Sequence, residues 1–267
     1  MKFYLDTNAL RQLSNRKEIL SHKDVFCSQW SIFELISGID SPDEFRRRKN
    51  ILERVKNTAH IYWTSPKQIL FSAFGHEIVD EDIIVTRKML EHISLIDSFD
   101  ELQQLEIEVL GTIYTLKHFL WYDNEISQSI MSQLESQPHD SHIRESIQRP
   151  EIRQTLKELS IARHIETTFN CRRCDETYLD ALNHYLEIPI LDDYWTAIIY
   201  LSNDAVYKGK TLGKNDAFDY GHLAYSGLVT HFVTDDKLFH RKIPSELLSV
   251  KIIKVSDFLD LIENNER

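Results

Sequence analysis

The sequence predicts an α/β fold with a central parallel sheet and an inserted helical subdomain, and three observations support this. Strand and helix patterns alternate over residues 1–64 and again over 191–267, as they do in parallel sheets. Residues 75–190 show helical periodicity with no convincing strand. The 267 residues include only 7 Gly and 6 Pro, which favours long helices over the many turns of an all-β sandwich. We therefore expect a discontinuous domain, 1–74 and 191–267, interrupted by an all-helical insertion at 75–190.

The amino-terminal part begins with a short apolar strand that leads directly into polar residues. The strand is expected at 2–6, and Asp6, Thr7 and Asn8 are residue types that often cap a following helix. The remaining patterns predict, in order, a helix at about 9–21, an irregular connection at 24–29, helices at about 31–38 and 42–58, and a strand at 60–63.

The insertion and the carboxyl-terminal part continue these patterns. A polar stretch at 135–146 is expected to be a loop. The insertion shows helical periodicity at 83–96, 101–121, 125–135, 150–169 and 175–188. After it we expect a helix at 192–201, a loop at 206–215, a helix at 216–228, a strand at 230–234, a short helix, a strand at 250–255 and a terminal helix.

Composition and charge limit the classes of function. A chain that is 42% hydrophobic and 27% charged can bury a substantial core. Three cysteines are too few for a disulfide scaffold, and one Cys-x-x-Cys pair at 171–174 is a weak zinc signal. No signal peptide or long apolar run is present, so we expect a soluble, cytoplasmic protein without membrane contact. The net charge of -11 argues against nonspecific adhesion to nucleic acid but is compatible with a local basic patch.

Acidic residues occur where predicted strands end and predicted helices begin. Asp6 follows the first strand, and Asp235 and Asp236 follow the strand at 230–234, so parallel strands would bring them to one edge of the sheet. Several carboxylates gathered there cannot all stay ionised without a cation, and Mg²⁺ or Mn²⁺ takes such oxygen ligands. The candidate catalytic and metal-binding residues are Asp6, Glu34, Asp216, Asp219 and Asp236.

The acids on predicted helices have distinct surroundings. Glu34 lies among apolar neighbours, where an unpaired carboxylate is costly, so we expect a metal or a basic partner beside it. Asp216 and Asp219 are three residues apart at a helix start and share one face. His222 follows on the same helix. We expect it to pack in the core as a neutral side chain, with contact to a phosphate or a metal as the alternative.

Four motifs resemble, in the same order, those of the PIN-domain ribonucleases, a family that includes the toxins of many bacterial toxin-antitoxin pairs. They are "FYLDTNAL", "SIFELISGI", "LGKNDAFDYGHLAYS" and "HFVTDDKLF". The resemblance covers roughly the first 65 and last 75 residues, and the helical middle has no counterpart in compact family members. It implies a three-layer, Rossmann-like PIN domain that cleaves RNA with Mg²⁺ or Mn²⁺.

The resemblance also implies roles for individual residues. Asn8 and Thr234 would arrange the site through hydrogen bonds, and the family pattern Thr-x-Asp favours Asp236 over Asp235. Asp235 then either supports the site or simply starts the next helix. The residues that would hold the metals are Asp6, Glu34, one or both of Asp216 and Asp219, and Asp236.

Three basic groups could meet a nucleic-acid backbone. The run at 46–49 is expected to be a solvated helix face, and a second group lies in the insertion at Arg144, Arg149 and Arg153. The best candidate is the loop that enters the helix of Asp216, because its ammonium groups would hold a phosphate next to the metals. Its basic residues are Lys208, Lys210 and Lys214.

These observations lead us to expect a metal-dependent endoribonuclease that acts as a toxin or as an RNA-processing enzyme. One alternative is a nuclease of the same fold that cuts DNA or a flap structure. Another is a PIN-like binding module for nucleic acid or protein with weak or no catalysis. The expected partners are RNA or other single-stranded nucleic acid, and a protein or antitoxin that binds the insertion. A homodimer is compatible with the same sequence.

Overall fold

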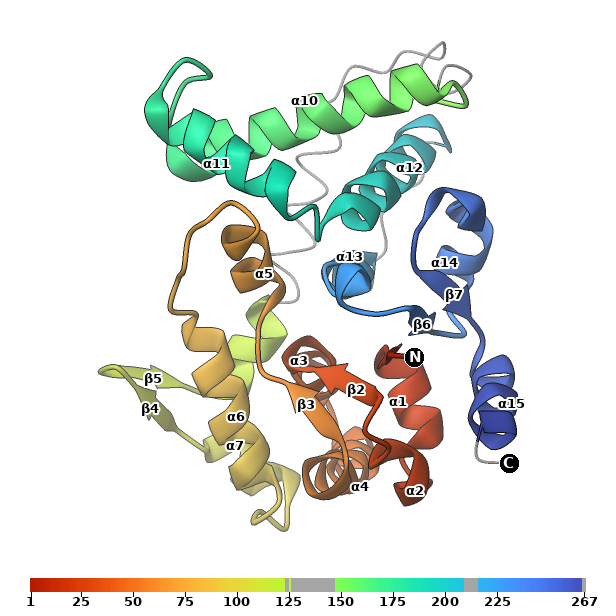
Figure 1. Cartoon of the computed structure of the whole chain (residues 1–267). Coiled ribbons are helices and arrows are strands. Elements are labelled where there is room, and N and C mark those ends of the chain that lie inside the picture. The colour runs from red at the N-terminus through yellow and green to blue at the C-terminus, as the bar shows by residue number, and fades with distance from the viewer. Residues whose placement is uncertain (123–124, 126–146, 209–215, 266–267) are drawn as a thin grey trace.

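The computed structural model describes residues 1–122, 125, 147–208 and 216–265. Within this part of the chain, a five-stranded parallel sheet lies among helices (Figure 1), in the order β3-β2-β1-β6-β7. The two ends of the chain do share one sheet, so the prediction of an α/β fold with a central parallel sheet is confirmed. The strands are β1 (Phe3–Leu5), β2 (Val25–Ser28), β3 (His60–Tyr62), β6 (His231–Val233) and β7 (Lys251–Ile253).

The strand order reverses at β1, and this positions the candidate site. Strands β2 and β3 continue the sheet on one side of β1, whereas β6 and β7 continue it on the other. Leu5 pairs with Val233, so the next residues of both strands, Asp6 and Thr234, leave the sheet at the same edge. A crevice beside the reversal, at the carboxyl ends of the strands, is where open α/β sheets bind ligands.

The helices of the amino-terminal part have side-chain caps that the sequence supplies. Asp6, Ser28 and Ser41 each accept a bond from a free backbone N–H at a helix start. The helix predicted at 9–21 is two helices, interrupted at 14–16. The elements are α1 (Thr7–Leu13), α2 (Lys17–Leu20), α3 (Gln29–Ser37) and α4 (Pro42–Thr58).

The irregular connection predicted at 24–29 is wrong, because this segment contains β2. Val25 and Cys27 are buried, and the strand lies between β1 and β3. A four-residue strand that is covered on both faces has no alternation of polar and apolar residues, so it gives little periodic signal.

The prediction of an all-helical insertion is also wrong at 107–114, where the chain forms an antiparallel hairpin. Strand β4 (Ile107–Val109) pairs with β5 (Thr112–Tyr114). The turn between them has positive φ at Leu110 and Gly111, 50° and 82°, which is the backbone of a two-residue hairpin turn. The helix predicted at 101–121 is therefore split into one that ends at Gln104 and another that covers 116–122.

The other helices of the middle region agree closely with the predicted periodicity. Helix α5 is an addition, because its pattern was too short to predict a helix. In Figure 1, α10, α11 and α12 gather at one end of the molecule, beyond α5 and α13. The predicted helix at 125–135 and loop at 135–146 lie almost wholly outside the described residues. The helices are α5 (Pro66–Ser72), α6 (Glu81–Ile93), α7 (Phe99–Gln104), α10 (Pro150–Phe169), α11 (Glu176–Glu187) and α12 (Asp192–Lys208).

The carboxyl-terminal elements follow the predicted order. The predicted helix at 216–228 is an α-helix followed by a 3₁₀ turn, and most of the predicted loop at 206–215 lies outside the described residues. None of the helices in the described part of the chain is long and apolar enough to cross a membrane. The elements are α13 (Asp216–Leu223), η1 (Ser226–Leu228), α14 (Lys237–Lys242), η2 (Ser245–Leu247) and α15 (Val255–Asn265).

One hydrophobic cluster joins the sheet to the middle region. It contains Phe3 and Tyr4 of β1 together with Val85 and Met89 of α6 and Ile165 of α10, all fully buried or nearly so. Helix α6 packs on α3 and α4, and α12 packs on α13 and α14. The middle region is thus attached to the sheet domain through shared apolar packing, which stabilises both.

Candidate active site

Asp6 is a buried carboxylate at the point where the strand order reverses. Only 3% of its surface is exposed, and its Oδ1 accepts a bond from the Ala9 N–H at 2.7 Å. Burial raises the pKa of Asp6 to about 6, although His222, the Ala9 N–H and the Thr234 hydroxyl favour its ionised form. The charge of Glu34 acts in the same direction as burial, so two carboxylates lie close enough to repel one another. A cation between them would relieve that repulsion.

Glu34 is held by a histidine and a hydroxyl. Its Oε2 accepts a bond from Nε2 of His222 at 2.9 Å and another from the hydroxyl of Thr7. Burial favours the protonated form of Glu34, but the bonds and charge of His222, with Thr7 and Arg48, hold its pKa below the usual range. Glu34 is therefore ionised, and its side chain stays 27% exposed. Both hydrogen bonds that side chains donate to this carboxylate end on Oε2, so Oε1 accepts none within the described residues.

A buried chain of polar groups fixes the histidine. Nδ1 of His222 lies 2.6 Å from the hydroxyl of Tyr4, which lies 2.7 Å from the hydroxyl of Ser28. Burial raises the pKa of Tyr4 well above its usual value, so its hydroxyl keeps its proton. With Nε2 donating to Glu34, the other ring nitrogen, Nδ1, shares a hydrogen bond with the Tyr4 hydroxyl. This chain gives His222, which is 1% exposed, a single orientation.

Thr234, Asp235 and Asp236 follow β6 at the same edge but do different things. The buried Thr234 hydroxyl accepts a bond from the Asp236 N–H at 2.9 Å, and Asp236 caps α14 through the Leu238 N–H at 2.7 Å. Asp235 is exposed. It accepts bonds from Gln12 at 2.8 Å and from the first N–H of α15 at 3.2 Å. Asp235 thus connects α1 to α15, whereas Asp236 stays beside Thr234.

The remaining predicted site residues are described only in part. Asn8 is exposed on α1, and its side chain has no hydrogen bond within the described part of the chain. Asp219 is half-buried on α13, one turn before His222, and it has an interaction partner. Asp216 is the first residue of that helix, but its side chain is not among those described. Lys210 and Lys214 lie outside the described residues.

The donor set fits a hard divalent cation in part. Asp6 and Glu34 supply carboxylate oxygens at a ligand-binding edge, and burial raises the pKa of Asp6 to about 6. Within the described residues, no group of three or more His, Cys, Asp or Glu has the geometry to hold a metal. The pair Asp6 and Glu34 therefore needs further ligands. Asp236 follows β6 at the same edge of the sheet, and Asp219 lies on α13 together with His222.

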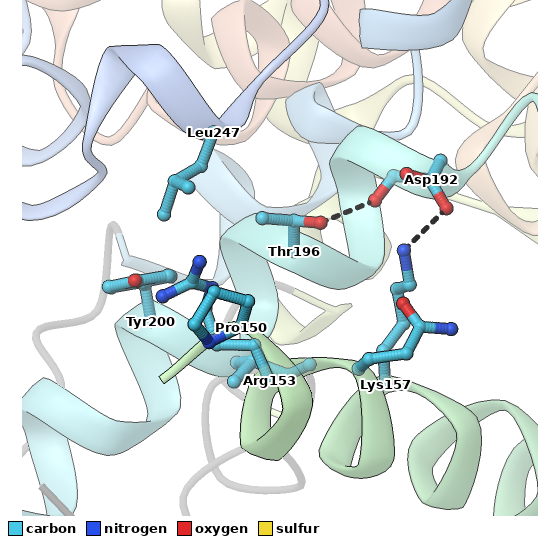
Figure 2. A pocket seen from close by; sticks show the side chains of 9 residues that line it. Pro150, Arg153, Lys157, Asp192, Thr196, Tyr200 and Leu247 are labelled. Atoms are coloured by element: carbon cyan, nitrogen blue, oxygen red, sulfur yellow. Dashed lines mark hydrogen bonds and ion pairs between the residues drawn. The ribbon is translucent and has the colours of Figure 1, made fainter. Parts of the chain in front are cut away.

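The basic residues of α10 are engaged within the protein. Arg153 donates to the carbonyls of Ile147 and Gln148 at 3.0 and 2.8 Å, and Lys157 pairs with Asp192 at 2.7 Å. Figure 2 shows these side chains in a cavity between α10 and α12, with Tyr200 opposite. Lys157 therefore links α10 to α12, whereas Arg153 binds the segment directly before its own helix.

The run at 46–49 is a solvated face, as predicted, only at Arg46 and Arg47, since the side chains of Arg48 and Lys49 are mostly covered. Arg46 pairs with Asp43 on the surface. Arg48 is only 14% exposed and donates to the carbonyls of Glu34 and Leu35 at 3.2 and 3.1 Å. Its guanidinium crosses Gly38, where a Cβ would collide with it. Arg48 thus satisfies the end of α3 and supports the position of Glu34.

The chain matches no family model, no curated protein and no solved structure. Its chemistry is therefore argued from the site. Three contributors were not predicted in their observed roles: His222, Thr7 and Tyr4. The available signal was the three-residue spacing of Asp219 and His222, which places both on one side of a helix. Nothing in the spacing of Tyr4 and Glu34 indicates that a histidine from the other end of the chain lies between them.

Proposed function

We propose that this protein is a metal-dependent endoribonuclease with its site at the carboxyl edge of the sheet. The observation that carries the proposal is the pairing of Asp6, a buried carboxylate short of positive charge, with Glu34, which a histidine and a hydroxyl hold ionised. Both lie where the strand order reverses. The resemblance of the four sequence motifs to PIN-domain ribonucleases supports RNA as the substrate.

In this proposal Asp6 and Glu34 hold Mg²⁺ or Mn²⁺ together with Asp236 and with Asp216 or Asp219. When bound, such an ion lowers the pKa of water and stabilises the charge that develops on a phosphodiester. His222 and Thr7 keep Glu34 in one orientation, which is the role of groups behind metal ligands. Burial of Asp6 excludes bulk water from one side of the site, so opposite charges attract more strongly there.

Replacement of Asp6 by Asn tests the proposal. The purified Asp6→Asn protein should cleave single-stranded or hairpin RNA no faster than buffer alone, in Mg²⁺ or Mn²⁺, while its circular dichroism matches the wild type. Asp43→Asn, which removes a carboxylate that is 87% exposed and distant in the fold, should cleave normally. A wild-type rate for Asp6→Asn, measured on gel-resolved products, would refute the assignment. The same assay with DNA and flap substrates decides between RNA and the alternative substrates.

A binding module with weak or no catalysis is the second candidate, and one observation favours it. Asp6 and Asp236 both cap helices, and no group of three metal-binding side chains occurs among the described residues. Such a module should bind RNA or a protein with equal affinity in the presence and absence of Mn²⁺. The nuclease should instead gain thermal stability from Mn²⁺, because a ligand that binds only the folded state stabilises it.

A biological role follows only after cleavage is established. The motif resemblance supports a toxin or an RNA-processing enzyme. Arrest of growth on expression of the wild type, with none on expression of Asp6→Asn, supports the toxin. Accumulation of unprocessed RNA without arrest supports processing.

A further inference from the structure

A cavity of about 260 Å³ lies on the same edge of the sheet as Asp6, beyond the ends of β2 and β3. Gln29 and Trp30 line it, directly after β2, and so does Ser65, which caps α5 after β3. The insertion contributes Tyr122 and, from α10, His164 to the lining, and Tyr194 of α12 completes it. Because parallel strands end together, this cavity and the candidate active site occupy adjacent parts of one ligand-binding edge.

The cavity walls are aromatic. Trp30, Phe71, Tyr122 and Tyr194 line it, and they come from four separate segments. Burial lowers the pKa of His164 to about 4, so its ring adds a further neutral wall at physiological pH. Flat aromatic walls favour a flat ring, because stacking is worth about 1–3 kcal/mol for each base bound to an aromatic side chain.

One buried acceptor in this cavity has no partner within the described part of the chain. Gln29 is completely buried, and its Oε1 makes no hydrogen bond. The orientation of the amide follows from Thr86, whose hydroxyl donates to the Asp82 carbonyl at 2.5 Å and so must accept from Nε2 of Gln29 at 3.0 Å. The carbonyl oxygen is therefore the free end. An unpaired buried acceptor costs free energy that an N–H donor from a ligand would recover.

The carboxylates of the cavity are acceptors as well. Asp80 already accepts from the Ser65 hydroxyl and the Asp82 N–H, and Asp82 accepts from His118 at 3.2 Å. Carboxylates inside the cavity disfavour a phosphate there. The cation Lys67 also lines the cavity and is exposed, so positive charge lies at the solvent side. A ligand with ring N–H donors inside and a phosphate outside matches this distribution of charge.

Helix α3 connects the cavity to the candidate active site. Trp30 and Glu34 are four residues apart, so their side chains are neighbours on one face, with roughly 6 Å between their Cβ atoms. Trp30 Nε1 also donates to the Phe218 carbonyl of α13 at 3.0 Å, which fixes the indole between the cavity and the helix of Asp219 and His222. One strand of nucleic acid can therefore reach both places.

We propose that this cavity binds one unpaired base of the RNA substrate, and that it prefers bases with an exocyclic amino group to uracil. The choice of RNA rests on the proposed nuclease function. Guanine, adenine and cytosine carry an amino group that can donate to Gln29 Oε1, whereas uracil presents two carbonyls beside its single N–H. The insertion then has a defined role, since it supplies two walls of the pocket.

The test measures binding without cleavage. Fluorescence anisotropy of uridine RNA octamers with one central guanine, adenine or cytosine is compared with the all-uridine octamer, in Ca²⁺, which takes oxygen ligands with looser geometry than Mg²⁺. The wild type should bind the amino-containing octamers about tenfold more tightly, the value of one good hydrogen bond. Gln29→Met should abolish this preference, since it removes the unpaired acceptor. It also removes the Nε2 bond to Thr86, whose hydroxyl keeps its bond to the Asp82 carbonyl.

Matched variants keep the result decisive. Gln68→Met changes a half-buried glutamine of α5 that does not line the cavity, and it should bind every octamer as the wild type does. Tyr194→Leu keeps an apolar wall but removes a ring, and it should weaken binding of all octamers about five- to hundredfold. A folded Gln29→Met protein with an unchanged preference overturns the proposal. If Gln29→Met does not fold, unchanged binding by Tyr194→Leu overturns it instead.

The outcomes separate this proposal from the nuclease function. Asp6-dependent cleavage without a base preference refutes the pocket and leaves the nuclease. A base preference that depends on Gln29, without any cleavage, refutes the nuclease and leaves the pocket. A wild type that binds none of the octamers refutes the pocket. Competition by guanosine monophosphate at the affinity of the octamer shows a free nucleotide to be the ligand and refutes the RNA assignment.

Discussion

At the scale of single residues, the site depends on where two carboxylates obtain their balancing charge. Glu34 has His222, Thr7 and Arg48 to stabilise its ionised form. For Asp6, burial outweighs the stabilising effect of its polar neighbours on the ionised form, so its pKa is raised to about 6. An ionised Asp6 at neutral pH therefore costs the folded protein stability when no cation is bound. Active sites commonly carry this kind of cost because the same groups must later bind or react.

The pH dependence of stability follows from that cost. A carboxyl with a raised pKa in the folded state binds its proton more tightly there, so the folded state loses stability as pH rises from about 4 to about 6. Asp6→Asn removes the charge and keeps a capping oxygen. In the presence of a metal chelator, this substitution should raise the free energy of unfolding at pH 7.5 by about 3 kcal/mol. The figure follows from the rise of about two units in the pKa of Asp6, at about 1.36 kcal/mol for each unit.

Urea denaturation at several pH values measures this gain. The gain should vanish below about pH 4, where both folded and unfolded forms of the wild type are protonated. Added Mn²⁺ should narrow the difference at pH 7.5, because the cation stabilises only the wild type. A gain that does not change with pH contradicts the assignment of the charge to Asp6.

His222 should act as a positioning residue for Glu34. His222→Gln breaks the chain between Tyr4 and Glu34, and loss of a group behind a metal ligand typically costs 10–100-fold in affinity or activity. We expect that loss in the cleavage rate at saturating RNA, with little change in the Michaelis constant. The matched control is His231→Gln, a buried histidine at the start of β6 that contacts Thr230 instead. If both variants lose cleavage rate equally, His222 contributes only to stability and does not position Glu34.

At the scale of elements, the hairpin β4–β5 contains a local strain. Leu110 adopts φ of 50°, a left-handed backbone that costs a leucine about 1 kcal/mol, and its side chain is 73% exposed. Leu110→Asn should raise the free energy of unfolding by about 0.5–1 kcal/mol, because Asn tolerates this conformation. Leu95→Asn controls for the loss of an exposed leucine, since Leu95 is 80% exposed and has negative φ. If thermal denaturation shows the same change in stability for both variants, the strain at Leu110 is contradicted.

The elements that sequence patterns could predict are those with a long period or a polar boundary. The helices at 42–58 and 150–169 begin with Pro and have buried faces of regular spacing. Strand β2 has three buried residues out of four and no polar alternation, and β4–β5 interrupts a helical pattern with a turn at Leu110. In the site, the position of Asp6 follows from the strand end. The contact of Glu34 with His222 joins residues 188 apart, which only the fold determines.

At the scale of the whole molecule, a buried carboxylate joins α12 to the sheet. Asp193 of α12 is 4% exposed and accepts three bonds from the segment before β7, from Ser249 N, Ser249 Oγ and Val250 N, at 2.7–2.9 Å. These bonds connect the helix that follows the insertion to an edge strand of the sheet. A buried carboxylate that accepts three hydrogen bonds stabilises such a contact more than a surface ion pair does.

Replacement of Asp193 should therefore weaken the entire fold. Asp193→Asn places an amide N–H against these donors and should lower the free energy of unfolding by about 2–3 kcal/mol. The neighbouring Asp192→Asn is the control, since Asp192 is 52% exposed and pairs only with Lys157 and should cost under about 1 kcal/mol. If urea denaturation gives equal losses of unfolding free energy for Asp193→Asn and Asp192→Asn, the bonds of Asp193 do not stabilise the fold.

The pairing of β1 with β6 has a consequence for the timing of synthesis. Asp236 is synthesised 230 residues after Asp6, and it follows the strand that must lie beside β1. At 5–20 residues per second, about 10–50 seconds separate the two. During that interval the central strand lacks one neighbour and the carboxylates have not assembled. A nascent chain can therefore assemble this carboxylate edge only after β6 has been synthesised, so the proposed nuclease would stay inactive until then.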